Sequence, residues 1–166
     1  MPPSELAGRL LVATPVIGDP NFDRTVVLVL DHGEDGALGL VLNRPTDVAV
    51  GESLPRWADL VSPPAVVFVG GPVEQAAAIG LGRPLPSPAV EDPPWSPIPS
   101  GDAGVGPLVT LDLSADPGPG AALASVRVFV GYAGWGPGQL EAELAQQAWL
   151  VVRPRPHDLW SVDPED

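Results

Sequence analysis

Two side chains of this 166-residue chain have the chemistry of an acid–base catalyst, His32 and Glu141. His32 follows Asp31, and a histidine paired with a carboxylate is a common general base. Adjacent side chains of a strand point to opposite faces, however, so Asp31 cannot simply orient His32. The alternative is a histidine that caps a turn or packs at the edge of the core. The sequence leaves both interpretations open.

Arg44 lies between Asn43 and Pro45, directly after an apolar run that predicts a strand. Its guanidinium could hold a carboxylate or a phosphate with two parallel hydrogen bonds, next to a proline whose backbone is fixed. The alternative is an ordinary ion pair with one of the 21 acidic residues. Gly70 and Gly71 end another apolar run, where their backbone amides could be exposed to a ligand.

Glycines at positions 131, 134, 136 and 138 separate a predicted strand from a predicted helix. A glycine-rich loop in this context can hold an anion at the start of the helix. The spacing does not match the G-x-G-x-x-G dinucleotide motif, so tight turns are the alternative role. The chain must turn abruptly between the two elements, so we expect a positive φ or a close backbone approach among these four glycines. If Gly134 has such a conformation, Gly134→Ala should cost more than about 1 kcal/mol.

Four further side chains in this segment suit a binding surface. Tyr132 and Trp135 would form an apolar wall, and Gln139 and Glu141 would supply polar contacts. Trp135 could instead anchor the core, because large aromatic side chains bury much apolar surface. The two roles predict different exposure, since a pocket wall is partly exposed and a core anchor is buried.

Composition excludes several classes of site. The chain has no cysteine, and its two histidines lie at positions 32 and 157, so we predict no metal site. The signatures of serine hydrolases, zinc proteases and P-loop proteins do not occur, and we predict no cofactor. His157 lies in a polar, proline-rich tail, where we expect it to be solvated.

The excess of acidic over basic residues argues against some classes of binding partner. The chain has 21 acidic and 8 basic residues, and its formal net charge is −13. Nucleic acids and anionic membranes attract clustered cations, so we expect no direct nucleic-acid binding and no membrane binding. The longest uncharged stretch, 60–73, is too short for a spanning helix. We therefore expect a cytoplasmic protein that binds a small molecule or another protein.

The elements that position these residues are mostly strands, because the apolar runs are short and rich in valine and leucine. We predict strands at 10–15, 25–31, 37–43, 65–71, 76–82, 108–113, 126–132 and 149–154. We predict helices at 50–61, 118–124 and 139–149. The proline-rich segment 83–107 is predicted to be a loop within a single domain that spans residues 1–166.

Several segments occur along the chain in an order that is typical of one protein family. They extend over nearly the whole chain, from about Gly8 to the C-terminal DLWSVD. They are LLVATP, Asp19 and Phe22, DHGEDGALGLVLNRP, GGPV and GYAGWGPGQLEAEL. Together they resemble the YqgE/AlgH family of small bacterial proteins. The resemblance implies one compact α/β domain, with a mixed, bifurcated sheet folded toward a pseudo-barrel and flanked by helices.

The resemblance implies no defined activity and supplies no catalytic residues. Alginate-associated members carry the description of transcriptional regulator, but this sequence contains no DNA-binding motif. The alternatives are a hydrolase that uses His32 or Glu141, a regulator that acts indirectly through a partner, and a purely structural scaffold. Our leading hypothesis is a pocket for a small molecule or a peptide at strand ends, formed by Asn43, Arg44, Gly70, Gly71, Tyr132, Gly134, Trp135, Gln139 and Glu141.

Overall fold

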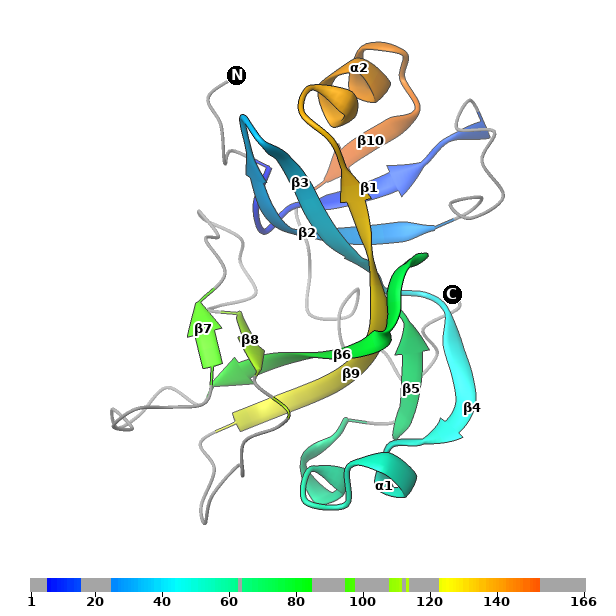
Figure 1. Ribbon diagram of the computed structural model, residues 1–166, viewed down its shortest axis with the longest axis vertical. Helices are drawn as coiled ribbons and strands as arrows, with labels where there is room; N and C mark the ends of the chain where they lie inside the picture. Colours follow the sequence, from blue (N-terminus) through cyan, green and yellow to red (C-terminus); the bar gives the residue numbers. More distant parts are fainter. Residues whose placement is uncertain are drawn as a thin grey trace.

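The computed structural model describes residues 6–15, 25–62, 64–84, 95–97, 108–111, 113 and 123–152. These residues form a strand-rich structure with short helices (Figure 1). The helices are α1 (Val50–Ser53), the 3-10 helix η2 (Ala58–Leu60) and α2 (Gln139–Ala145). The strands are β1 (Leu10–Ala13), β2 (Val26–Gly33), β3 (Gly36–Val41), β4 (Pro45–Ala49), β5 (Val66–Val69), β6 (Val73–Pro84), β7 (Trp95–Pro97), β8 (Val109–Leu111), β9 (Leu123–Trp135) and β10 (Trp149–Val152).

The strands form one mixed sheet that branches at β9. The strand order is β10-β1-β2-β3-β9-β6-β8-β7, and β5 joins β9 outside this path and also pairs with β4. β5 runs parallel to β9, whereas the other pairs are antiparallel. The predicted fold is confirmed as a single mixed α+β domain with a bifurcated sheet, which does not close into a barrel.

β9 is longer than predicted and carries the branch. Its N-terminal part pairs with β5 and β6, and its last residues pair with β3. Figure 1 shows β9 running from the lower part of the sheet to the upper end, where α2 lies. The positive φ expected among the glycines of this segment is confirmed at Gly131, at 73°, and at Gly138, at 74°, whereas Gly134 pairs with Leu38 inside the sheet.

Apolar clusters cover both faces of the sheet, as the continuous apolar runs predict. Val27 and Leu28 are adjacent in β2 and point to opposite faces, yet both are fully buried. They belong to different clusters, and the cluster of Val27 lies between the sheet and α2. The buried members of this second cluster are Leu6, Leu11, Val27, Val29, Val41, Ala133, Trp135, Leu140, Ala148 and Trp149.

The first half of the chain contains one interrupted helix and one unpredicted strand. The helix predicted at 50–61 forms only the short elements α1 and η2, because Pro55 lies between them and cannot donate a helical hydrogen bond. β4 was not predicted, since Thr46 and Asp47 break its apolar pattern. No helix within the described part of the chain is both long and apolar enough to cross a membrane.

The second half of the chain differs from the prediction at several boundaries. The last two residues of the helix predicted at 118–124 begin β9, and 118–122 lie outside the described residues. The helix predicted at 139–149 ends at Ala145, so that β10 can begin at Trp149. The segment 83–107 includes the end of β6 and the short strand β7, and its other residues are outside the described part.

Candidate functional site

His32 and Glu141 meet in the folded chain although they are 109 positions apart in the sequence. His32 lies near the end of β2, and Glu141 lies in the first turn of α2. Nε2 of the imidazole is 3.2 Å from Oε2 of the carboxylate. The histidine is 4% exposed, whereas half of the Glu141 side chain is exposed. The two candidate acid–base residues therefore form one pair, with its histidine inside and its carboxylate at the surface.

A β-bulge in β2 turns His32 toward α2. The register between β2 and β3 shifts between Val29 and Asp31, so that Asp31 lies opposite Leu38 and His32 lies opposite Ala37. The extra residue of a bulge reverses which face the following side chains occupy. As a result His32 is buried and Asp31 is exposed. This agrees with the expectation that Asp31 does not orient the imidazole.

The second imidazole nitrogen of His32 has an unusual environment. Nδ1 is buried and makes no hydrogen bond among the described residues. When Nε2 carries the proton and donates to Glu141, Nδ1 is a buried acceptor with no hydrogen bond from the described residues. A buried acceptor without a partner costs about 1–3 kcal/mol. The pair therefore has a hydrogen-bonding capacity that the described residues do not use.

A second carboxylate, Glu143, connects α2 to the sheet. Its Oε1 accepts hydrogen bonds from the indole N–H groups of Trp135 and Trp149, at 3.0 and 2.9 Å. Its Oε2 accepts one from Nε2 of Gln139 at 3.0 Å, and Oε1 of Gln139 accepts one from the Gly136 amide. The two indole rings pack edge to face, with centroids 6.0 Å apart. Glu143 therefore joins the helix to two buried tryptophans.

Trp135 and Gln139 have structural roles in this arrangement. Trp135 is 5% exposed and belongs to the cluster between the sheet and α2, which is the burial expected of a core anchor. Gln139 is exposed, but both ends of its amide are already hydrogen-bonded. Glu143 was not among the site residues expected from the sequence. The available signal was the i, i+4 spacing of Gln139 and Glu143, which places them on one helix face.

The candidates that follow β3 and β5 form a different group. Asn43 accepts a hydrogen bond from the Val26 amide through Oδ1 at 3.1 Å, and the Arg44 carbonyl accepts one from the Val69 amide at 2.9 Å. These bonds hold the turn after β3 against its neighbours. Arg44 is partly buried and makes further polar contacts.

Gly70 and Gly71 are required for close packing against β9. A Cβ on Gly70 would lie 2.5 Å from the Gly131 carbonyl oxygen, and one on Gly71 would lie 2.1 Å from the backbone of Tyr132. The Gly70 amide donates to the Val130 carbonyl, and its own carbonyl accepts from β3. The sheet therefore uses the Gly70 backbone groups that the sequence suggested for a ligand. Tyr132 is half-buried and packs against the core.

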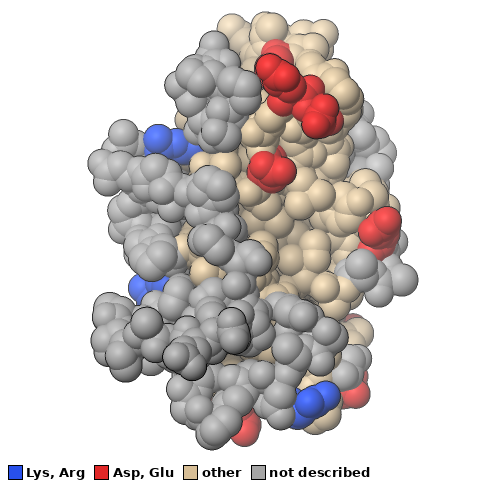
Figure 2. Space-filling view, turned by 60° about the vertical axis from the view of Figure 1, so that its left-hand side comes forward, with Lys and Arg blue, Asp and Glu red and all other residues tan. Residues whose placement is uncertain are grey.

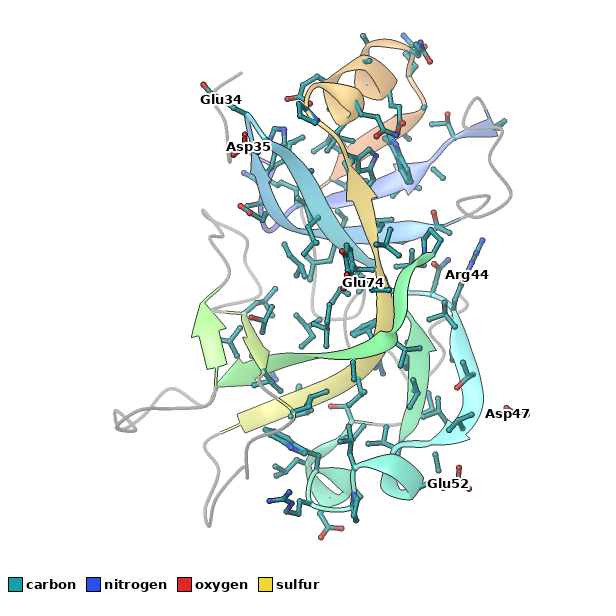
Figure 3. The ribbon with its side chains drawn as sticks, in the orientation of Figure 1. Glu34, Asp35, Arg44, Asp47, Glu52 and Glu74 are labelled. Carbon is teal, nitrogen blue, oxygen red and sulfur yellow. The ribbon has the colours of Figure 1, made fainter. Side chains whose placement is uncertain are left out.

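The two groups lie at opposite ends of β3. Ala37, beside Trp135, and Asn43 are six positions apart, which corresponds to about 20 Å of extended chain. Figure 3 shows the same separation, with Glu34 and Asp35 at the upper end of the hairpin and Arg44 well below them. The candidate residues are therefore spread along β3 and β9. Trp135, Gln139 and Glu141 lie at α2 with His32, whereas a Cβ on Gly134 would face Tyr132 and Val73.

The end of the molecule near α2 is acidic. Glu34 and Asp35 are exposed at the tip of the β2–β3 hairpin, and Glu141 is exposed on α2. Figure 2 shows acidic side chains gathered on the upper part of one face. Within the described residues, no group of three or more potential ligands is arranged to hold a metal ion. His157 lies outside the described residues.

One buried cation lies away from this end of the molecule. Arg127 in β9 is 1% exposed, and its guanidinium lies 4.7 Å from the centre of the Phe68 ring. Burial lowers the pKa of Arg127 to about 10. Because this side chain is packed inside the sheet, we assign it to the core rather than to the site.

A family model described as AlgH-like matches residues 10–166. The chain belongs to the AlgH-like family. A UPF0301 protein of Streptomyces avermitilis is 52% identical to it over 165 residues, which are 98% of this chain and 82% of that one. A UPF0301 protein of Mycobacterium tuberculosis is 40% identical over 154 residues, which are 92% of this chain and 74% of the other.

Two solved structures extend the AlgH-like assignment to the fold. A crystal structure of a Corynebacterium diphtheriae protein has a TM-score of 0.81 at 31% identity, and covers 93% of this chain and 78% of its own. The solution structure of AlgH from Pseudomonas aeruginosa has a TM-score of 0.65 at 32% identity, with coverage of 95% and 82%. The resemblance stated from the sequence is thus confirmed at the level of family and fold.

Proposed function

We propose that this AlgH-like protein is a cytoplasmic binding protein whose ligand contacts the surface formed by α2 and the β2–β3 hairpin. The observation that carries the proposal is the pair of His32 and Glu141. The imidazole is buried and holds a half-exposed carboxylate at 3.2 Å, while its Nδ1 stays without a hydrogen bond among the described residues. A carboxylate held in this way is a preorganised acceptor for a ligand.

The chemistry of this end favours a ligand that donates hydrogen bonds and carries positive charge. Glu141 offers the oxygens of a carboxylate, and Glu34 and Asp35 add negative charge at the nearby hairpin tip. Primary amines and the basic side chains of a peptide satisfy both requirements, whereas phosphates are repelled. Binding of a basic segment of another protein would also allow an indirect regulatory role, without direct contact with DNA.

A hydrolase is supported less well by the same geometry. A carboxylate that orients Nε2 would leave Nδ1 as the general base. Nδ1 of His32 is buried, however, so a substrate cannot approach it in this conformation. The pair therefore has the components of a catalytic dyad, but its carboxylate is exposed and its free imidazole nitrogen is buried. This arrangement favours binding over catalysis.

Amide chemical-shift mapping by NMR tests the proposal directly. The probes are spermidine and a tetra-lysine peptide, with inorganic phosphate as the anionic comparison. We expect the cationic probes to shift amides of the hairpin and of residues 134–141, and phosphate to leave them unchanged. Glu141→Gln should weaken cation binding about fivefold, because an exposed charge pair is worth up to about 1 kcal/mol.

The matched control for this experiment is Glu52→Gln. Glu52 is also an exposed glutamate of a short helix, but it lies in α1 at the opposite end of the molecule (Figure 3). The control variant should bind the probes as the unmodified protein does. Equal weakening by both substitutions would show that only net charge attracts the probes, and would contradict the proposed site.

A further inference from the structure

The net charge of the pair formed by His32 and Glu141 depends on the protonation state of the imidazole. Nε2 lies 3.2 Å from Oε2 of the carboxylate, and it can donate to that oxygen in the neutral ring and in the protonated ring. The neutral ring leaves the pair with one negative charge, whereas the protonated ring leaves it with none. The contact therefore persists while the charge presented to a ligand changes.

The other acidic side chains of the hairpin do not pair with His32. Within the described residues, Glu141 is the one acidic group at ion-pairing distance from the imidazole. Asp31 precedes His32 in β2, but it is exposed whereas His32 is buried. Glu34 and Asp35 are exposed at the hairpin tip (Figure 3).

The neighbouring elements bring one carboxylate to the imidazole. In β3 the uncharged Ala37 lies opposite His32, and in β9 the uncharged Trp135 pairs with Ala37. α2 contributes Glu141, and its next carboxylate, Glu143, accepts hydrogen bonds from two indole groups instead. Nδ1 of His32 makes no hydrogen bond among the described residues. Within this part of the chain, the charge of a protonated ring is therefore balanced by Glu141.

A cationic ligand at Glu141 competes with the protonated imidazole for the same carboxylate. A bound cation neutralises the charge that stabilises the imidazolium, and it also repels the imidazolium directly. A protonated His32 in turn weakens the attraction of Glu141 for the ligand. Such effects on binding equilibria are reciprocal, so the proton and the ligand weaken each other's binding by the same factor.

We propose that cation binding at Glu141 is coupled to the loss of a proton from His32, so that acidification releases the ligand. This inference rests on the proposed function and adds the regulation of that site. Histidine is the side chain that ordinarily changes its charge between about pH 5 and 8. The affinity is highest where the ring is neutral, and it falls as the pH decreases and the ring takes up a proton. On binding, the proton that leaves the imidazole passes to the solvent.

The test measures the affinity of an N-acetylated tetra-lysine peptide at about pH 8 and about pH 5, because lysine side chains keep their charge over this interval. We expect binding about fivefold weaker at the lower pH, which is the loss expected for Glu141→Gln, since both changes remove the negative charge of the pair. His32→Gln keeps a donor that does not titrate, so its affinity should change by less than about twofold. His157→Gln removes the other histidine and is the matched control, which should keep the pH dependence of the unmodified protein.

Proton release on binding is a second measurement, and it needs no substitution at His32. Calorimetric titration at about pH 6, in two buffers with different ionisation enthalpies, counts the protons exchanged when the peptide binds. We expect a net release of up to about one proton per peptide bound. His157→Gln should release the same number. This measurement decides the question if the His32→Gln protein does not fold.

The outcomes separate the coupling from the binding site itself. Absence of peptide binding at about pH 8 would refute the proposed function, and this inference with it. Binding that is equally strong at both pH values would refute the coupling alone. The same conclusion would follow if His32→Gln kept the full pH dependence, or if binding released no proton.

Discussion

Glu143 should contribute more to stability than an ordinary partly exposed glutamate, because two buried indole groups depend on it. Trp135 and Trp149 are 5% and 3% exposed, and both donate to the same carboxylate oxygen. Glu143→Ala leaves these two donors without their acceptor, and each unpaired buried donor costs about 1–3 kcal/mol. Water can reach part of this site, since Glu143 is only partly buried. We therefore expect a loss near the lower end of the sum, about 3 kcal/mol.

Urea denaturation followed by circular dichroism and by tryptophan fluorescence measures this loss. A change of about 3 kcal/mol corresponds to a fall in Tm of roughly 6–12 °C for a domain of this size. Glu143→Gln keeps one acceptor oxygen for the indoles but loses the charge, so it should cost about 1 kcal/mol. Glu52→Ala is the control and should change stability by less than about 0.5 kcal/mol. A Glu143→Ala protein as stable as this control would refute the anchoring role.

Three further predictions concern the glycines, the surface pair and the buried cation. In the same urea assay, Gly70→Ala should lower the free energy of unfolding by more than about 2 kcal/mol or prevent folding, because its Cβ would meet the Gly131 carbonyl. Gly134→Ala would make ordinary 3.7 Å contacts and should cost under about 0.5 kcal/mol. Glu141→Gln should change the free energy of unfolding by under about 1 kcal/mol, because half of the side chain is exposed. Burial lowers the pKa of Arg127 to about 10, so the unfolded chain holds this proton more tightly than the native one. Relative to Arg127→Met, the free energy of unfolding should therefore rise as the pH increases above about 10, and parallel pH profiles of the two proteins would contradict this.

The sequence was a good guide to the strands and a poor guide to what connects them. Runs such as 25–31 and 37–43 became β2 and β3, because short valine-rich and leucine-rich segments have few alternatives to a buried strand. The predicted strand 126–132 continues to Trp135 because β3 extends far enough to pair with residues 133–135, so Gly134 is not part of the turn. That pairing is a tertiary contact, and no local pattern in the glycine-rich segment indicates it.

The position of His32 shows a second limit of local patterns. Strict alternation along β2 would place His32 on the same face as Leu28 and Leu30, away from α2. The bulge between Val29 and Asp31 reverses this alternation and brings the imidazole to Glu141. Nothing in a run of valines and leucines shows where an extra residue will be accommodated. The sequence therefore identified the two members of the pair but not their contact.

The expectation of a single pocket came from the geometry of parallel sheets. In parallel α/β sheets the carboxyl ends of the strands meet at one edge, so residues that follow different strands come together there. β3 and β9 are antiparallel, and Asn43 follows β3 while Gln139 follows β9. Their carboxyl ends consequently point in opposite directions, which separates the candidates into two groups. The group beside α2 contains the half-exposed Glu141 carboxylate held by the buried His32, and this is the reason to place the proposed ligand there.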